Sequence, residues 1–239
     1  MDNSLVAVLE GRSAMFHSVV PFEPAKDRLL SFDFTSNNKE LSSGIFDDTR
    51  QFTDYLNQKL RLAQAKYGIG GYNEYRELYK RSKVFGSEGA TDEPRRLHLG
   101  IDIWGKPYTK VMSPLDAVVH SFAFNNNYGD YGATTILSHN LDGQSFHTLY
   151  GHLSLNSIKN LSEGGNIKRG DVIGEFGIPM ENGQWPPHLH FQIIEDIGEW
   201  KGDYPGVCKL SEKEKYLANC PDPDLVLKMM RFANQQIPV

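Results

Sequence analysis

The chain of 239 residues is poor in cysteine: Cys208 and Cys220 are its only two. Eleven residues lie between them, a spacing that matches no compact zinc knuckle. The two thiols could form one disulfide, but two free cysteines are as compatible with the sequence. A cysteine-rich scaffold, whether disulfide-bonded or metal-bound, is therefore excluded.

Long hydrophobic runs and an excess of basic residues are also missing. No apolar run reaches the roughly 18 residues that a membrane-spanning helix needs, so we predict no transmembrane segment. The formal net charge is −5, which argues against nucleic acid as a partner.

The first 12 residues do not resemble a secretory signal, because no basic region precedes a long apolar one. We expect a cytoplasmic protein, or a chain whose export signal has been removed.

The residues that are abundant favour sheet and turns: the chain has 22 glycines, 12 prolines and 11% aromatic residues. Its length suffices for one large domain, or for a medium domain with an extra lobe. We predict a mainly β fold, α+β overall. The expected divisions are an N-terminal extension at 1–90, a β-rich domain at 91–197, and a helical C-terminal tail at 198–239 that packs on the domain.

The N-terminal extension is expected to be irregular up to about residue 45, apart from one or two short strands. A helix is predicted near residues 48–66, because Asp47 or Asp48 can cap it. Apolar residues follow at helical spacing: Phe52, Tyr55, Leu56, Leu60 and Ala63. This apolar face indicates that the helix packs against the rest of the protein.

The β-rich region divides into several expected strands. Residues 111–124 are predicted to form two strands broken near Pro114. Residues 133–138 and 145–150 are predicted to form a hairpin. The glycine-punctuated residues 164–177 indicate tight turns around one short strand.

A strand with an unusual polar face is predicted at residues 97–103, where apolar and other residues alternate strictly. Side chains alternate between the two faces of a strand, so His98 and Asp102 lie on the same face. A histidine and a carboxylate on a solvated strand face need no special role, so the pattern alone is weak.

The second such strand contains His188 and His190, which project from one face while Leu189 between them points into the core. If the two strands lie side by side, three of the four polar groups could close on one ion. Two histidine nitrogens and one carboxylate oxygen are a common zinc set that leaves a fourth position for water. The remaining group would then move protons.

A further histidine, His152, is expected at the end of the strand that follows the hairpin turn. It could stabilise the negative charge that develops on a tetrahedral intermediate. The other histidines are predicted to be surface or hydrogen-bonded residues without a role: His17, His120, His139 and His147.

Four motifs, in this order, resemble those of the lysostaphin-type zinc metallopeptidases. They are His98-Leu-Gly-Ile-Asp102, Tyr150-Gly-His152-Leu, Ile167-Lys-Arg-Gly-Asp-Val-Ile-Gly174 and Pro187-His-Leu-His-Phe191. The resemblance covers about residues 90 to 195, and it is specific because four separate motifs agree. One segment departs from the pattern: residues 180–187 are bulkier and stiffer than the small Gly/Ser/Thr-rich segment usual there, so the groove wall should differ.

The resemblance implies that His98, Asp102 and His190 bind one Zn²⁺, and that His152 and His188 are the catalytic histidines. It implies a compact antiparallel β-sheet metallopeptidase domain at 91–197, with its site in a groove between loops. The implied function is a zinc-dependent metalloendopeptidase, a hydrolase with a zinc-bound water as nucleophile. Its implied partner is peptidoglycan, cut in cross-bridges or stem peptides, or another peptide substrate.

Two alternatives of other classes stay open at the level of the sequence. One is a phosphocarrier of the sugar-transport type, which has a related β-fold and uses two nearby histidines without a carboxylate ligand. Asp102 on the face of His98 argues against it. The other is a non-catalytic binding or activator module that uses the groove without turnover.

Overall fold

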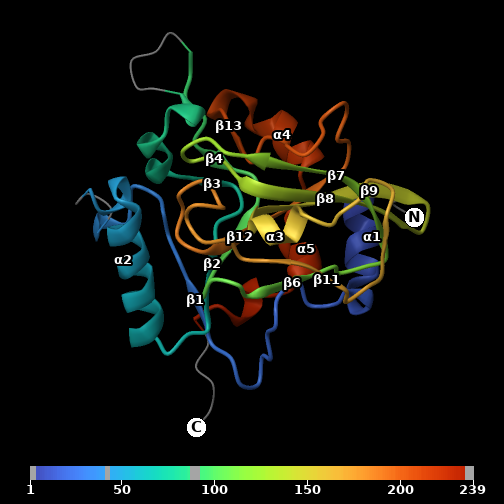
Figure 1. Cartoon of the computed structure of the whole chain (residues 1–239), viewed down its shortest axis with the longest axis horizontal. Coiled ribbons are helices and arrows are strands. Elements are labelled where there is room, and N and C mark those ends of the chain that lie inside the picture. The colour runs from blue at the N-terminus through green and yellow to red at the C-terminus, as the bar shows by residue number, and fades with distance from the viewer. Residues whose placement is uncertain (1–3, 41–43, 87–91, 235–239) are drawn as a thin grey trace.

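The computed structural model describes residues 4–40, 44–86 and 92–234, and a single eight-stranded sheet runs through its centre (Figure 1). The strand order is β1 (Leu29–Ser31), β2 (Tyr67–Gly70), β5 (Ile101–Trp104), β12 (His188–Ile194), β9 (Gln144–Leu153), β8 (Gly132–Leu141), β7 (Ala117–Asn125) and β10 (Asn166–Ile167). Neighbouring strands in this sheet are antiparallel, except β1 and β2, which are parallel. The expected mainly β, α+β fold is confirmed, with a mixed sheet in place of a purely antiparallel one.

Two small sheets flank the large one. One pairs β6 (Lys110–Met112) with β11 (Val172–Glu175), and the other joins β3 (Glu74–Tyr75), β4 (Leu97–His98) and β13 (Val207–Cys208). The predicted hairpin is β8 and β9, and the predicted break near Pro114 separates β6 from β7. The predicted domain boundary at residues 90 and 91 lies outside the described residues.

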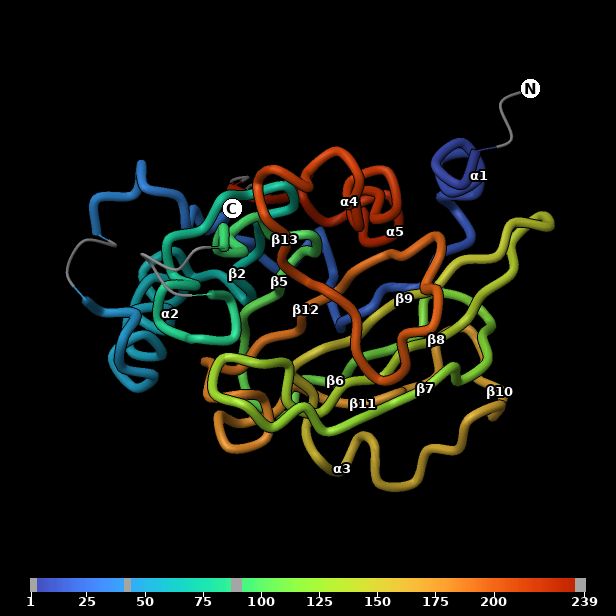
Figure 2. Tube along the Cα trace, turned by 90° about the horizontal axis from the view of Figure 1, so that it is seen from above, coloured from blue at the N-terminus to red at the C-terminus, as the bar shows by residue number. Residues whose placement is uncertain are grey.

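The described helices are short and lie around the sheets (Figure 1). They are α1 (Leu5–Gly11), α2 (Thr49–Leu62), α3 (Leu155–Ile158), α4 (Lys213–Asn219) and α5 (Asp224–Leu227), with short 3₁₀ turns η1 (Ser13–Met15), η3 (Ile45–Asp47), η4 (Glu77–Arg81), η5 (Lys83–Phe85), η6 (Leu210–Glu212) and η7 (Met230–Phe232). In both views α1 and α2 lie at opposite ends of the molecule (Figure 2). None of the described helices is long and apolar enough to cross a membrane.

The helix α2 lies where the sequence predicted one, and the Asp48 carboxylate accepts a hydrogen bond from the Gln51 amide at 2.8 Å. The expectation of an irregular segment before residue 45 was wrong for α1. Ser4 caps this short helix, and Leu5 and Leu9 are fully buried. A helix of seven residues has little stability of its own, so burial of this apolar face is what holds it.

An aromatic cluster joins α2 to the edge of the sheet. Phe52 of α2 lies 4.6 Å from Phe46, 5.8 Å from Phe34 and 5.6 Å from Trp104 of β5, measured between ring centroids. Since these rings are buried, residues before 90 contribute part of the core on which β5 rests. The first two strands of the large sheet, β1 and β2, come from the same part of the chain.

The predicted continuous strand at 97–103 was wrong, because the chain leaves one sheet and enters another there. β4 ends at His98 and β5 begins at Ile101. Between them the Leu99 amide donates to the Gly206 carbonyl at 2.9 Å. A Cβ atom at Gly100 would lie 2.5 Å from the His190 ring, so only glycine fits. The strict alternation of residues 97–103 is compatible with one strand, and it does not reveal that β4 pairs in a different sheet from β5.

Candidate active site

Strand register brings the predicted polar residues to one place. β12 lies between β5 and β9, with His190 opposite Asp102 on one side and opposite Gly151 on the other. His188 lies opposite Trp104. The face of β12 that carries both histidines therefore meets the carboxylate of β5, as the even spacings in the sequence require.

Three donor atoms converge at this point. His98 Nε2 lies 2.9 Å from His190 Nδ1 and 3.3 Å from Asp102 Oδ1, and His190 Nδ1 lies 3.1 Å from the same oxygen. Tetrahedral zinc with bonds of about 2.0–2.1 Å places neighbouring donors roughly 3.3–3.4 Å apart. The observed triangle is close to one face of such a tetrahedron, so these residues fit a zinc ion with a fourth position left over.

Hydrogen bonds set the orientation of both imidazole rings. His98 Nδ1 donates to the Gly71 carbonyl at 3.1 Å, which leaves its Nε2 as the lone-pair donor. His190 Nε2 donates to Gln192 Oε1 at 2.9 Å, which leaves its Nδ1 free to bind. An outer hydrogen bond of this kind is the usual way in which proteins fix the tautomer of a metal-ligating histidine.

Burial and neighbouring charges put His98 and Asp102 in the ionisation states that a metal needs. Burial, and next the charge of Arg76, lower the pKa of His98 to about 3, so its ring is neutral. Burial acts to raise the pKa of Asp102, but His98 and Arg76 outweigh it and hold the pKa well below its usual range. Neutral imidazole and ionised carboxylate are the forms that bind a divalent cation.

The other two predicted site residues, His152 and His188, lie beside this triangle with their rings stacked at 4.1 Å. The Pro186 carbonyl accepts from Nδ1 of His188 at 2.7 Å, and the Asn182 carbonyl accepts from Nδ1 of His152 at 2.8 Å. In both residues Nε2 therefore carries the lone pair. Burial lowers the pKa of His188 to about 4, and burial together with the charge of His188 lowers that of His152.

The backbone of His152 is unusual. Its φ of 63° lies in the left-handed region, which non-glycine residues rarely adopt. The Tyr131 carbonyl accepts from the His152 amide at 2.9 Å, and the His152 carbonyl accepts from the Gly177 amide at 2.9 Å. These bonds hold the turned residue at the end of β9, where the alternation of the strand no longer decides the side-chain direction.

Four of the five residues line a cavity of about 130 Å³: Asp102, His152, His188 and His190. His98 does not line it. Its other walls come from residues 76–85, 129–131 and 200–207, and from Trp185. Thus segments on both sides of the 91–197 region enclose the site, and many of their side chains are aromatic.

Sequence reasoning missed several residues that shape the site. Gln192 could have been found from the sequence, because it lies two residues after His190 and so shares the strand face of His188 and His190 on β12. Tyr131, whose hydroxyl lies 3.4 Å from His190 Nε2, has no such signal. Neither has Arg76, which comes from a segment that the sequence presents only as charged and aromatic.

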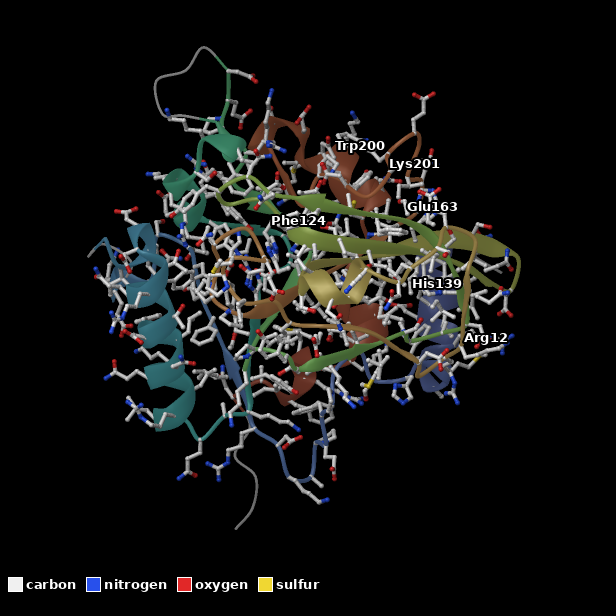
Figure 3. All side chains as sticks on the ribbon, in the orientation of Figure 1. Arg12, Phe124, His139, Glu163, Trp200 and Lys201 are labelled. Atoms are coloured by element: carbon white, nitrogen blue, oxygen red, sulfur yellow. The ribbon has the colours of Figure 1, made fainter. Side chains whose placement is uncertain are left out.

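The remaining four histidines lie outside the group of converging donors. His17 is exposed, and the rings of His120 and His147 lie 5.1 Å apart. His139 of β8, labelled in Figure 3, is buried and bonded to the Thr148 hydroxyl at 2.7 Å. Burial lowers the pKa of His139 to about 4.

His139 leads to a prediction on stability. A histidine has a pKa near 6.5 in an unfolded chain, so between pH values of about 6.5 and 4 the unfolded state binds more protons than the native one. The free energy of unfolding should therefore fall as the pH is lowered through this range, with His139 contributing roughly 3 kcal/mol. Urea unfolding of chelator-treated protein at several pH values measures it, and His139→Gln should show a shallower fall. An unchanged slope in that variant would contradict the assignment.

A buried His–Asp–His triangle on a sheet, next to two oriented histidines and a cavity, defines a metallopeptidase type of site. Residues 96–202 match the model described as Peptidase family M23. Over this segment the chain is similar to the family, and the segment contains the complete His98, Asp102 and His190 set. The resemblance to lysostaphin-type enzymes is thereby confirmed.

Solved structures of peptidases are also similar to this chain. The catalytic domain of the antimicrobial peptidase lysostaphin from Staphylococcus simulans is 23% identical, with a TM-score of 0.39, over 68% of this chain and 97% of that one. A zinc-containing peptidase from Vibrio cholerae is 25% identical, with a TM-score of 0.36, over 52% of this chain. The chain spans only 32% of the length of that peptidase. No curated protein sequence matches the chain.

Proposed function

We propose that this protein is a zinc metalloendopeptidase that hydrolyses peptide bonds in peptidoglycan, in cross-bridges or stem peptides. The observation that carries the proposal is the triangle of His98, Asp102 and His190 donors at 2.9–3.3 Å, open to a cavity that His152 and His188 also line. A zinc ion there would supply Lewis-acid activation of water and of the scissile carbonyl.

The chain's own residues supply the remaining functions. His188 and His152 are neutral at pH 7 with Nε2 unprotonated, so each can accept a proton and return it to the leaving amine. When protonated, either ring can hydrogen-bond a developing oxyanion. Both histidines are buried, and the low dielectric of their surroundings strengthens these interactions.

The peptidoglycan substrate is supported by the four lysostaphin-like motifs. The enclosing segments 76–85 and 200–207 support a narrow substrate, because an extended peptide with small side chains occupies the least space beside the metal. The phosphocarrier alternative is disfavoured, since the carboxylate of Asp102 completes the donor set at 3.1 Å from His190.

The test uses the full chain loaded with Zn²⁺. It is incubated with purified peptidoglycan and with a panel of short Gly- and Ala-containing peptides, and mass spectrometry looks for new amino and carboxyl termini. Cleavage should disappear with a chelator and return when Zn²⁺ is added in excess. Tightly bound zinc with no cleavage of any substrate would reject the endopeptidase and favour the binding module.

A further inference from the structure

One fully charged side chain is buried beside the proposed metal ligands. Arg76 follows β3 directly, outside the segment that matches the peptidase family, and its side chain is only 1% exposed. Burying a guanidinium is unfavourable unless it is paired and hydrogen-bonded. The position of Arg76 therefore depends on what it contacts.

The guanidinium lies between two carboxylates. Its Nη1 donates to Asp102 Oδ2 at 2.5 Å and to the Tyr79 hydroxyl at 3.2 Å, and its Nε donates to Glu74 Oε2 at 2.6 Å. The Arg76 amide also donates to the Arg96 carbonyl at 2.9 Å. The backbone of Arg76 is thus bonded to the residue before β4, and its side chain to Asp102 of β5.

The two carboxylate oxygens of Asp102 have different contacts. Oδ2 accepts from Arg76, while Oδ1 faces His98 Nε2 at 3.3 Å and His190 Nδ1 at 3.1 Å. Rotating the carboxylate out of this orientation would break a charge-assisted hydrogen bond in a buried place. Only one oxygen is therefore directed at the centre of the donor triangle.

We propose that Arg76 is a positioning residue, which holds Asp102 as a single-oxygen ligand and balances its charge at the metal site. The inference rests on the proposed metal centre and is independent of the substrate. It makes the segment before residue 91 an integral part of the site. Hydrogen-bond partners behind a metal ligand typically change metal affinity by about 10- to 100-fold when removed.

The test measures affinity for Zn²⁺ alone, by competition of the metal-free full chain with a chromophoric chelator. Arg76→Met should bind Zn²⁺ about 10- to 100-fold more weakly than the wild type. Arg76→Lys should fall in between, because an ammonium keeps the charge but lacks the planar fork that reaches both carboxylates. The visible spectrum of the Co²⁺-loaded forms should also change, since it reports the ligand geometry.

Arg81→Met is the matched control. Arg81 belongs to η4 in the same segment, stacks on Trp185 at 4.7 Å and donates to the Thr49 hydroxyl at 2.8 Å, but does not contact Asp102. Its loss should disturb packing of the segment without changing the affinity for Zn²⁺. An equal loss of affinity in Arg81→Met would show a general structural effect and overturn the proposal.

The outcomes separate the two proposals. Unchanged Zn²⁺ affinity in Arg76→Met, with binding by the wild type, rejects only the role of Arg76. Failure of the wild type to bind Zn²⁺ rejects the metal site itself. If Arg76→Met does not fold, the affinity of Arg76→Lys decides: a several-fold loss supports the proposal, and an unchanged value overturns it.

Discussion

Replacing Asp102 by Asn is expected to lower the rate of peptide hydrolysis by at least about 10³-fold, because the metal that the residue helps to hold contributes several kcal/mol of transition-state stabilisation. The amide has almost the shape of the carboxylate but no charge, so it is a poor ligand for a divalent cation. It also removes one of the two carboxylates that pair with the buried guanidinium of Arg76. Metal content and kcat/KM should therefore fall together.

Asp116→Asn provides the control for this prediction. Its carboxylate is 70% exposed and accepts a hydrogen bond from the Arg169 amide at 2.8 Å, so the same chemical change at the surface should leave both quantities unaltered. Inductively coupled plasma mass spectrometry of dialysed protein measures the metal. If Asp102→Asn kept one zinc per chain and most of its activity, the assigned ligand set would be wrong.

Replacing His188 or His152 by Ala should have a different outcome: activity lost with the metal retained. Neither ring belongs to the donor triangle, and both are oriented by backbone carbonyls with Nε2 as the proton acceptor. General acid–base groups typically contribute about 10²- to 10⁴-fold, so a loss of kcat in that range is expected for each variant. Metal content should stay close to that of the wild type.

The double variant should lose little more than the worse single variant, because groups that act in one step are strongly non-additive. His17→Ala, at an exposed histidine, is the matched control and should be fully active. Loss of metal in His188→Ala would instead make this residue a ligand. The division of roles between His188 and His190 on one strand face would then have to be reversed.

Stacking explains why His188 is held as rigidly as the ligands. Its ring lies 3.8 Å from the Trp104 ring with 13° between the planes, and Trp104 in turn packs on Phe34 and Phe52. The aromatic cluster under α2 therefore reaches the proposed proton-transfer group directly. The site thus depends on the N-terminal part of the chain for core packing as well as for Arg76.

Local patterns in the sequence singled out the three residues whose donor atoms converge. A period of two explains the common face of His188 and His190 on β12, but not the convergence of His98 and Asp102, which lie on strands of different sheets. The hairpin of β8 and β9 and the helix α2 were equally predictable. In each case the signal is contained within a few consecutive residues, which is all that a periodic pattern can report.

The sequence by itself determined which side chains could share the face of a strand. Its four motifs also indicated the chemistry of a zinc metallopeptidase. Only the tertiary structure decided that β4 and β5 belong to different sheets, that His152 turns with a φ of 63°, and that Arg76 reaches Asp102 from 26 residues away. These features depend on strand register and close packing between distant segments. Neither has a counterpart in local spacing, because the energy that selects them comes from contacts that exist only once the chain has folded.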